Sequence, residues 1–378
     1  MRAARSGSVR RVVLLALVAG GFAALGVAGA SGVGGVAPAT VPLPPGVTEL
    51  VLAEDGSRAV VVTVTFDRQR EVPERAVVVV QAPAGQVLWR ANLPAVGCCN
   101  FPVLSTTRNA RQVAVGGAQG VDVFRSDGLR VASLDLGQVG SLNTGLQLWA
   151  DGRGLVAGQV EGVVKAFALP RPRLLWRAAV GSALLGVSLN EASGEVLALT
   201  AEGFVGLEAR GGTVRYRVPA RGVPVAAASA AGRGFVVGWK GADEVLRVGF
   251  LEGGRWRWHR ALGRVTVPLF EADPSARWVA VSDFLGRTAW LLGAGGRLLW
   301  TAEGTPAAVG LDPGGPVAVA TEDVLEVRAP GAGAVRWRTR LEGRAHVVRL
   351  RSGVLGVLGS PDRQSVLPDR LWLWRLDR

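Results

Sequence analysis

The sequence predicts an all-β protein whose body is a β-propeller of four-stranded blades, and three observations lead to this prediction. Short Val- and Leu-rich runs alternate with Gly, Asp and Pro, and 53 of the 378 residues are glycine, which favours many short strands over helices. A short sequence motif that runs from Gly to Trp recurs about every forty residues. Segments such as 60–64 and 76–80 are apolar on both faces, as expected for sheets packed between other sheets.

The repeat is marked by an aromatic residue that follows a glycine by four positions. Successive copies lie 37 to 44 residues apart. The aromatic anchors are Trp89, Trp176, Tyr216, Trp258, Trp300 and Trp337, with Ala132 as a degenerate copy and Pro172 in the glycine position before Trp176. A unit of this size cannot bury both faces of its sheet alone, so we expect the anchors to fill the gaps between neighbouring blades.

Eight candidate third strands follow the repeat, one more than the anchors. They lie near Val77, Val121, Val163, Val205, Leu246, Ala289, Val324 and Leu371. The last unit stops after residues 371–376, so its outermost strand is missing from that end, and residues 36–43 are the candidate to replace it. Such a closure leaves only short protected edges. We therefore expect eight blades, with seven as the alternative.

The N-terminal region has the pattern of a targeting segment. Four arginines are followed by an uncharged apolar stretch over residues 12–30, which ends in Ala-Gly-Ala as signal peptides do. The stretch is close to the ~20 residues that span a bilayer, so an uncleaved anchor is the alternative. We assign residues 1–30 to this segment, 31–46 to a linker with the ring-closing strand, and 47–378 to the propeller. The body is then extracytoplasmic: periplasmic, secreted or anchored through the N-terminal segment, and contact with a membrane is expected only through that segment if it is uncleaved.

The chain is basic, with a formal net charge of +13. Beyond residue 30 there is no run of consecutive basic residues and no motif that combines basic and aromatic residues for nucleic acid, so no nucleic-acid partner is expected. Many predicted outer strands alternate Arg with apolar residues, as in 215–217 and 336–340. Charges on an outermost strand discourage pairing with the edge of another molecule, and we expect a monomer.

Two of the units resemble a known repeat. Residues 161–169 with 174–177, and residues 202–207 through Tyr216, look like the PQQ-like (quinoprotein-type) propeller repeat. That family includes calcium- and quinone-dependent dehydrogenases and also non-catalytic propellers that act as scaffolds in the cell envelope. The loops that would carry the metal ligands and the cofactor-stacking ring are short here, and no catalytic residue can be carried over. No cofactor is therefore expected; PQQ and calcium belong to the enzymatic alternative.

Cys98 and Cys99 are the only cysteines, and they lie in the connection after the first anchor strand. Neighbouring Cα atoms are about 3.8 Å apart, which is less than the usual span of a disulfide, so a bond between them would form a strained ring. Quinoprotein alcohol dehydrogenases have a similar ring near their cofactor. A rigid loop element, a redox or ligand role and free thiols all remain open. No metal site is expected, because only His259 and His346 add imidazoles, and both fall on predicted strands.

The predicted partner site lies where two long connections between second and third strands meet. Residues 66–75 belong to the first unit and residues 360–370 to the eighth, and closure of the ring makes these units neighbours. The candidate contacts are Asp67, Arg68, Arg70, Glu71, Cys98, Cys99, Asp362, Arg363, Asp369 and Arg370. Trp239 with Lys240 is a weaker candidate at another such turn, because an exposed Trp often marks a contact. The alternative is that both loops are tolerated surface insertions.

These observations favour a non-enzymatic propeller that binds a protein partner, or serves as a scaffold, in the cell envelope. One alternative is a small PQQ-like oxidoreductase that uses the central cavity. Another is a sensor for glycans or peptides. Fold alone does not choose between these functions.

Overall fold

The structure is a computed structural model. It describes residues 37–65, 74–93, 103–117, 120–136, 145–230, 232–266, 268–273, 275–283, 288–303, 308–312, 315–321, 323–363, 365 and 367–376. Within these segments, the helical element is a single 3-10 turn, Ala294–Gly296, and no helix is long and apolar enough to cross a membrane. The predicted signal or anchor segment, residues 1–30, lies outside them.

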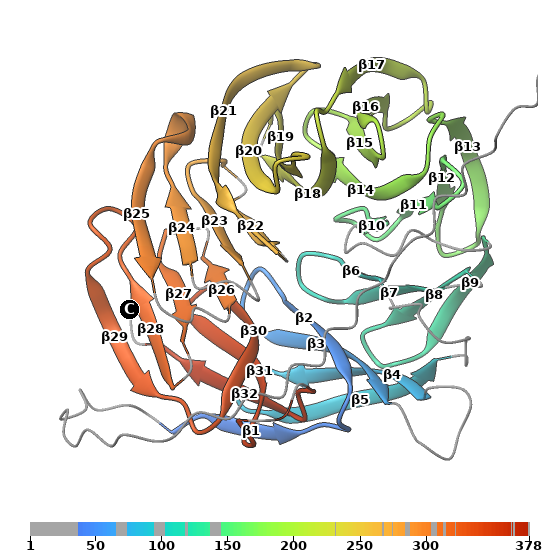
Figure 1. Ribbon diagram of the computed structural model, residues 1–378. Coiled ribbons are helices and arrows are strands. Elements are labelled where there is room, and N and C mark those ends of the chain that lie inside the picture. The colour runs from blue at the N-terminus through green and yellow to red at the C-terminus, as the bar shows by residue number, and fades with distance from the viewer. Residues whose placement is uncertain are drawn as a thin grey trace, which may run out of the picture. The chain divides into compact units, whose positions relative to one another are not determined.

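Eight four-stranded antiparallel sheets form a ring of blades, as the sequence predicted (Figure 1). Blade 1 consists of β2 (Val47–Leu52), β3 (Arg58–Thr65), β4 (Glu74–Gln81) and β5 (Gln86–Leu93). Blade 2 consists of β6 (Val103–Thr106), β7 (Gln112–Gly117), β8 (Gly120–Arg125) and β9 (Arg130–Asp135). Blade 3 consists of β10 (Leu146–Leu148), β11 (Gly154–Gln159), β12 (Val163–Ala168) and β13 (Arg173–Ala179). Blade 4 consists of β14 (Leu184–Asn190), β15 (Glu195–Thr200), β16 (Gly203–Glu208) and β17 (Val214–Pro219).

The remaining blades follow the same order. Blade 5 consists of β18 (Val223–Ala230), β19 (Gly234–Lys240), β20 (Val245–Glu252) and β21 (Arg255–Arg264). Blade 6 consists of β22 (Pro268–Ala272), β23 (Val279–Asp283), β24 (Thr288–Leu292) and β25 (Leu298–Glu303). Blade 7 consists of β26 (Ala308–Leu311), β27 (Val317–Ala320), β28 (Val324–Arg328) and β29 (Val335–Arg340). Blade 8 consists of β30 (Arg344–Arg351), β31 (Val354–Ser360), β32 (Arg370–Arg375) and β1 (Ala39–Pro42).

The last blade is closed by the first strand of the chain. β1 pairs antiparallel with β32, with Ala39 opposite Leu373 and Pro42 opposite Arg370. The strand predicted from residues 36–43 is therefore confirmed, and so is the count of eight. All eight third strands contain the residues from which they were predicted.

The blades pack face to face because their middle strands are apolar on both sides. Every residue of β15 and β31 is buried, and the same is true of most of β3. The buried residues form clusters that join adjacent blades, such as the one that contains Val156 of blade 3 and Val196 of blade 4. The core is thus a ring of interfaces between sheets, not a single centre.

The Gly and the Trp of the repeat are two halves of one contact between blades. Trp176 of blade 3 lies against Gly212 of blade 4, where an added Cβ would lie 2.5 Å from the indole ring, and its Nε1 donates to the Ala209 carbonyl at 2.8 Å. The same contact recurs in four more pairs: Trp89 with Gly128, Tyr216 with Gly254, Trp258 with Gly296, and Trp300 with Gly333. Five of the six aromatic anchors therefore lie in gaps between neighbouring blades.

Each of the seven outer strands β5, β9, β13, β17, β21, β25 and β29 has a β-bulge just before its anchor. The register skips one residue there; in blade 3, for example, Ala166 is opposite Trp176 and Phe167 is opposite Leu174. The skipped residues are Leu88, Val131, Leu175, Arg215, Arg257, Leu299 and Arg336. A bulge bends the strand and interrupts its free edge, which opposes pairing with another molecule.

Candidate functional site

The two faces of the ring carry different connections. We call the loop face the one that bears the connections from second to third strands and from blade to blade. The hairpin face bears the connections from first to second and from third to fourth strands. First and third strands run in the same direction within a blade, because all neighbouring strands are antiparallel.

Charged side chains link the inner strands of blades 6, 7 and 8. Glu271 of β22 is buried, with Oε1 3.0 Å from Arg349 Nε and Oε2 3.5 Å from Arg351 Nη1. Its Oε2 also accepts a hydrogen bond from the Leu311 N–H at 2.7 Å. Gly310 permits this contact, because a Cβ there would lie 2.9 Å from the Arg349 Cα. One carboxylate thus connects three consecutive blades.

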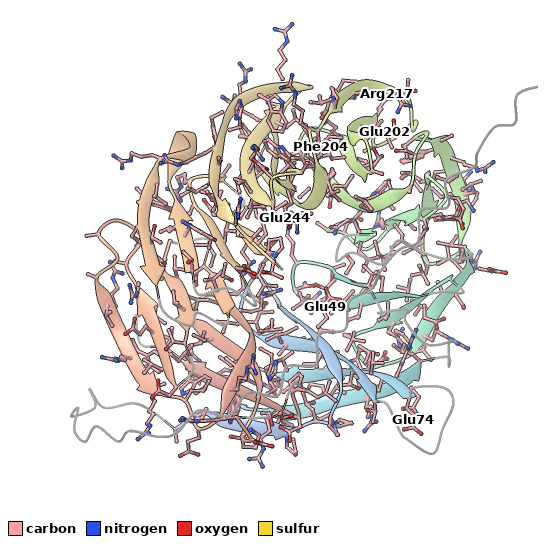
Figure 2. The ribbon with its side chains drawn as sticks, in the orientation of Figure 1. Glu49, Glu74, Glu202, Phe204, Arg217 and Glu244 are labelled. Atoms are coloured by element: carbon pink, nitrogen blue, oxygen red, sulfur yellow. The ribbon has the colours of Figure 1, made fainter. Side chains whose placement is uncertain are left out.

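Glu49 extends the charged cluster to blade 1. It lies on β2 toward the middle of the ring, whereas Glu74 lies near the outer edge (Figure 2). The Oε2 of Glu49 accepts a hydrogen bond from the Leu104 N–H of blade 2 at 3.2 Å. Burial raises the pKa of Glu49 to about 8, against the opposing effects of the Arg349 charge and the Leu104 N–H. A proton can therefore be gained or lost here near neutral pH.

The inner-strand charges are engaged with one another. Glu271 pairs with two of the three arginines of β30, Arg349 and Arg351, and Glu49 accepts a hydrogen bond from the backbone of the next blade. In the described part of the chain, no group of three or more His, Cys, Asp or Glu side chains is placed to hold a metal ion. This cluster joins blades, and none of its members was singled out from the sequence, because the residues approach only when the ring closes.

The predicted partner site falls on the loop face at blades 8, 1 and 2. The excursion after β31 joins the second and third strands of blade 8, and the one after β3 does the same in blade 1. Blades 8 and 1 are neighbours, as the 2.6 Å hydrogen bond from Ser352 Oγ to the Glu54 carbonyl shows. Six of the predicted contacts lie outside the described residues: Asp67, Arg68, Arg70, Glu71, Cys98 and Cys99.

The predicted first excursion ends earlier than expected. Glu74 and Arg75 belong to β4, not to the loop. The Arg75 side chain is buried and reaches blade 2, where its Nη1 would lie 3.4 Å from a Cβ on Gly117. Burial lowers the pKa of Arg75. This arginine is a contact between blades, which the long polar run around it concealed in the sequence.

The excursion of blade 8 is folded onto the ring. The Asp369 carbonyl accepts from the Leu43 N–H at 2.7 Å, and the Asp369 N–H donates to the Gly359 carbonyl at 3.0 Å. Within the excursion, the Ser365 N–H donates to the Asp362 carbonyl at 3.1 Å. Asp362, Arg363 and Arg370 are exposed, whereas Asp369 is partly buried. Asp369 therefore anchors the excursion, and the other three residues present charge to solvent.

His346 of β30 lies beneath this excursion. Its side chain is buried, and its imidazole interacts with the backbone of Ser365. Burial, with a smaller contribution from the charge of Arg344, lowers the pKa of His346 to about 4, against the opposing effect of the Ser365 backbone. The imidazole is neutral at pH 7, consistent with the structural role predicted for it.

Trp239 is not the exposed residue that we expected at a turn. It lies within β19 and is only 6% exposed, because second strands are covered on both faces. Its ring centroid is 4.8 Å from that of Trp256 and 6.3 Å from that of Phe204, which Figure 2 labels in blade 4. Lys240 ends β19 and forms an ion pair with Glu244. A partner contact at Lys240 stays a prediction.

Solved structures share this fold. The computationally designed protein Ika8 aligns with a TM-score of 0.62 and 14% identity over 90% of this chain and 100% of its own. BamB from Moraxella catarrhalis aligns with a TM-score of 0.57 and 13% identity over 88% of this chain and 100% of its own. The β-propeller domain of Myceliophteria thermophila Cps50 (Swd1) aligns with a TM-score of 0.52 and 13% identity over 75% of this chain and 99% of its own. No protein-family model and no curated protein matches the sequence. The fold is a β-propeller.

Proposed function

We propose that this propeller is a non-enzymatic module that binds a protein partner, or serves as a scaffold, outside the cytoplasm. The contact surface is the sector of the loop face at blades 8, 1 and 2. The observation that carries the proposal is the excursion of blade 8, which is held by backbone hydrogen bonds at Asp369 yet presents Asp362 and Arg363 outward, beside the exposed Arg370 at the start of β32. A preorganised charged loop on a rigid scaffold is typical of binding sites.

Two further observations support the proposal. The resemblance to PQQ-like repeats fits scaffold propellers of the cell envelope as well as dehydrogenases. Charged side chains of the inner strands of blades 6 and 8 pair with one another and join blades, as Glu271 does with Arg349 and Arg351. The extracytoplasmic location rests on the apolar stretch of residues 12–30 in the sequence.

Capture of a partner by the full chain tests the proposal. We would reverse the outward charges with Arg363→Glu and Arg370→Glu and recover bound envelope proteins after chemical crosslinking. The matched control is Arg221→Glu, an exposed arginine on the loop face between blades 4 and 5. We expect the double variant to lose a partner that the wild type and the control retain, at unchanged melting temperature. Retention of that partner by the double variant would refute the proposed surface.

The enzymatic alternative is tested by calorimetric titration of the full chain with PQQ and calcium. Specific binding must also raise the melting temperature, because a ligand that binds only the folded state stabilises it. We expect neither heat of binding nor a shift. Calcium-dependent binding would overturn the non-enzymatic assignment.

A further inference from the structure

Exposed apolar side chains gather at one edge of the ring. Among the described residues, eight large apolar side chains are strongly exposed. Six of them lie in the first residues of an outer strand, at its end nearest the hairpin face, and a seventh, Leu129, lies in the turn just before β9. These seven are Val87, Leu88, Leu129, Leu174, Leu175, Val214 and Val335, and Leu129 and Leu174 reach 56% and 50% exposure. We call this edge, the hairpins from third to fourth strands with the first residues of the outer strands, the hairpin rim. The eighth, Val223, begins an inner strand at the loop face.

The exposure recurs at one structural position. The apolar residues sit one or two places before the bulge or at it, in blades 1, 2, 3, 4 and 7. A single exposed Leu or Val is ordinary on a protein surface. These side chains are not needed to fill the gaps between blades, because in blades 1, 3 and 4 the aromatic anchor beside them already does so.

The hairpin rim is also cationic. From the end of the third strand to the residue after the anchor, each of the seven hairpins has more arginines than carboxylates. Some of these charges are neutralised locally, as Arg215 is by Glu208 at 3.9 Å. Arg171 and Arg173, next to Leu174, are exposed and have no acidic partner among the described residues. Exposed apolar and basic side chains together are the signature of a surface that meets anionic lipid.

The arrangement fits a flat occupant. The outer strands β5, β9, β13, β17 and β29 lie around the outside of the ring in Figure 1, so no compact partner reaches all of their hairpins at once. A plane across the hairpin face reaches all of them. The chain also enters the propeller on this side, because Ala39 is opposite Leu373 near the end of β32 that leads away from the loop face. The apolar stretch of residues 12–30 precedes that entry in the sequence.

We propose that the hairpin rim docks the propeller onto an anionic phospholipid bilayer. The Leu and Val side chains enter the headgroup region, and the arginines pair with lipid phosphates. The loop face then points away from the membrane. This proposal uses a different face from the partner-binding surface, and the two proposals are independent of each other.

Photo-crosslinking to lipid tests the docking with the full chain. A photoreactive residue is placed at position 174 on the rim or, as the matched control, at position 223 on the loop face. Each protein is mixed with vesicles of phosphatidylcholine alone or with one quarter phosphatidylglycerol. We expect lipid adducts at position 174 at least ten times more often than at 223, and only with the anionic vesicles.

Charge reversal separates docking from other attachment to the vesicle. A basic residue near an anionic surface changes the ratio of docked to undocked protein by about five-fold, so Arg171→Glu with Arg173→Glu should lower adducts at 174 by about 25-fold or more. Arg264→Glu with Arg340→Glu, at the loop-face ends of β21 and β29, should have no effect. Equal numbers of lipid adducts at positions 174 and 223 would overturn the proposal, and so would lipid adducts that form equally with and without the anionic lipid. The proposal would also be overturned if, with native membranes in place of vesicles, position 174 formed adducts with a protein.

Discussion

A methyl group added at Gly212 tests whether the Gly and the Trp of the repeat form one contact. The alanine Cβ would lie 2.5 Å from the ring of Trp176, closer than real Cβ contacts come. Gly212 also has a φ of +70°, a backbone conformation that favours glycine. The variant Gly212→Ala therefore carries two penalties, one from the backbone and one from the clash with the neighbouring blade.

The two penalties are separable because the same blade offers a matched glycine. Gly194 has a φ of +63° and nothing within 4 Å of its added Cβ. Gly194→Ala should lower the free energy of unfolding by about 1–2 kcal/mol, from the left-handed backbone alone. Gly212→Ala should cost that amount and a further ~1–3 kcal/mol for overpacking. Trp176→Ala removes the ring and should itself cost about 3–5 kcal/mol.

The assay is equilibrium unfolding in urea of the four proteins and of the double variant Trp176→Ala with Gly212→Ala. In the double variant, the methyl group enters the space left by the indole, so the added cost of Gly212→Ala should fall to that of Gly194→Ala. Equal destabilisation by Gly212→Ala and Gly194→Ala in the wild-type background would refute the reasoning. So would strict additivity in the double variant.

Three further predictions concern the ionisable groups. Glu271→Ala leaves Arg349 and Arg351 without their carboxylate and should cost about 3 kcal/mol in the urea assay, with Glu271→Gln milder. Because the folded state favours protonated Glu49, the wild type should lose about 1–2 kcal/mol as pH rises from 4.5 to 8, a smaller loss than a fully buried acid would show because this side chain is partly exposed. Glu49→Gln should remove that component. Because the folded state favours neutral His346, the wild type should lose stability as pH falls from 6.5 to 4, with faster amide exchange in residues 361–369, and His346→Gln should abolish the difference.

The repeat architecture was predictable because each blade interface leaves its mark locally. In each unit the glycine that contacts the anchor of the preceding blade lies four residues before the unit's own anchor. The contact between blades therefore appears in the sequence as a repeated motif. The exceptions agree with this account: the degenerate anchor Ala132 precedes the blade with Pro172 in place of glycine. Closure by residues 36–43 followed from counting strands.

Contacts between inner strands near the middle of the ring were not predictable from the repeated motif. Glu271 and Arg349 meet only because a bare Gly310 lets β30 approach β26, and nothing in the spacing of a charged pair on two different blades marks that approach. Trp239 was misjudged because a Trp before a Lys resembles a turn contact, whereas the strand is covered on both sides. Arg75 was hidden at the end of a polar run.

The pairing of β1 with β32 has a consequence for how the chain matures. Synthesis proceeds from the N-terminus, so β1 is made before the other strands of the described propeller and its partner β32 after them. Until the final strand exists, blade 8 has an open edge and β1 has nothing to pair with, and contacts this far apart in sequence form slowly. A product cut short near its C-terminus would keep that open edge, which invites aggregation and proteolysis. Ring closure therefore requires that synthesis has reached β32.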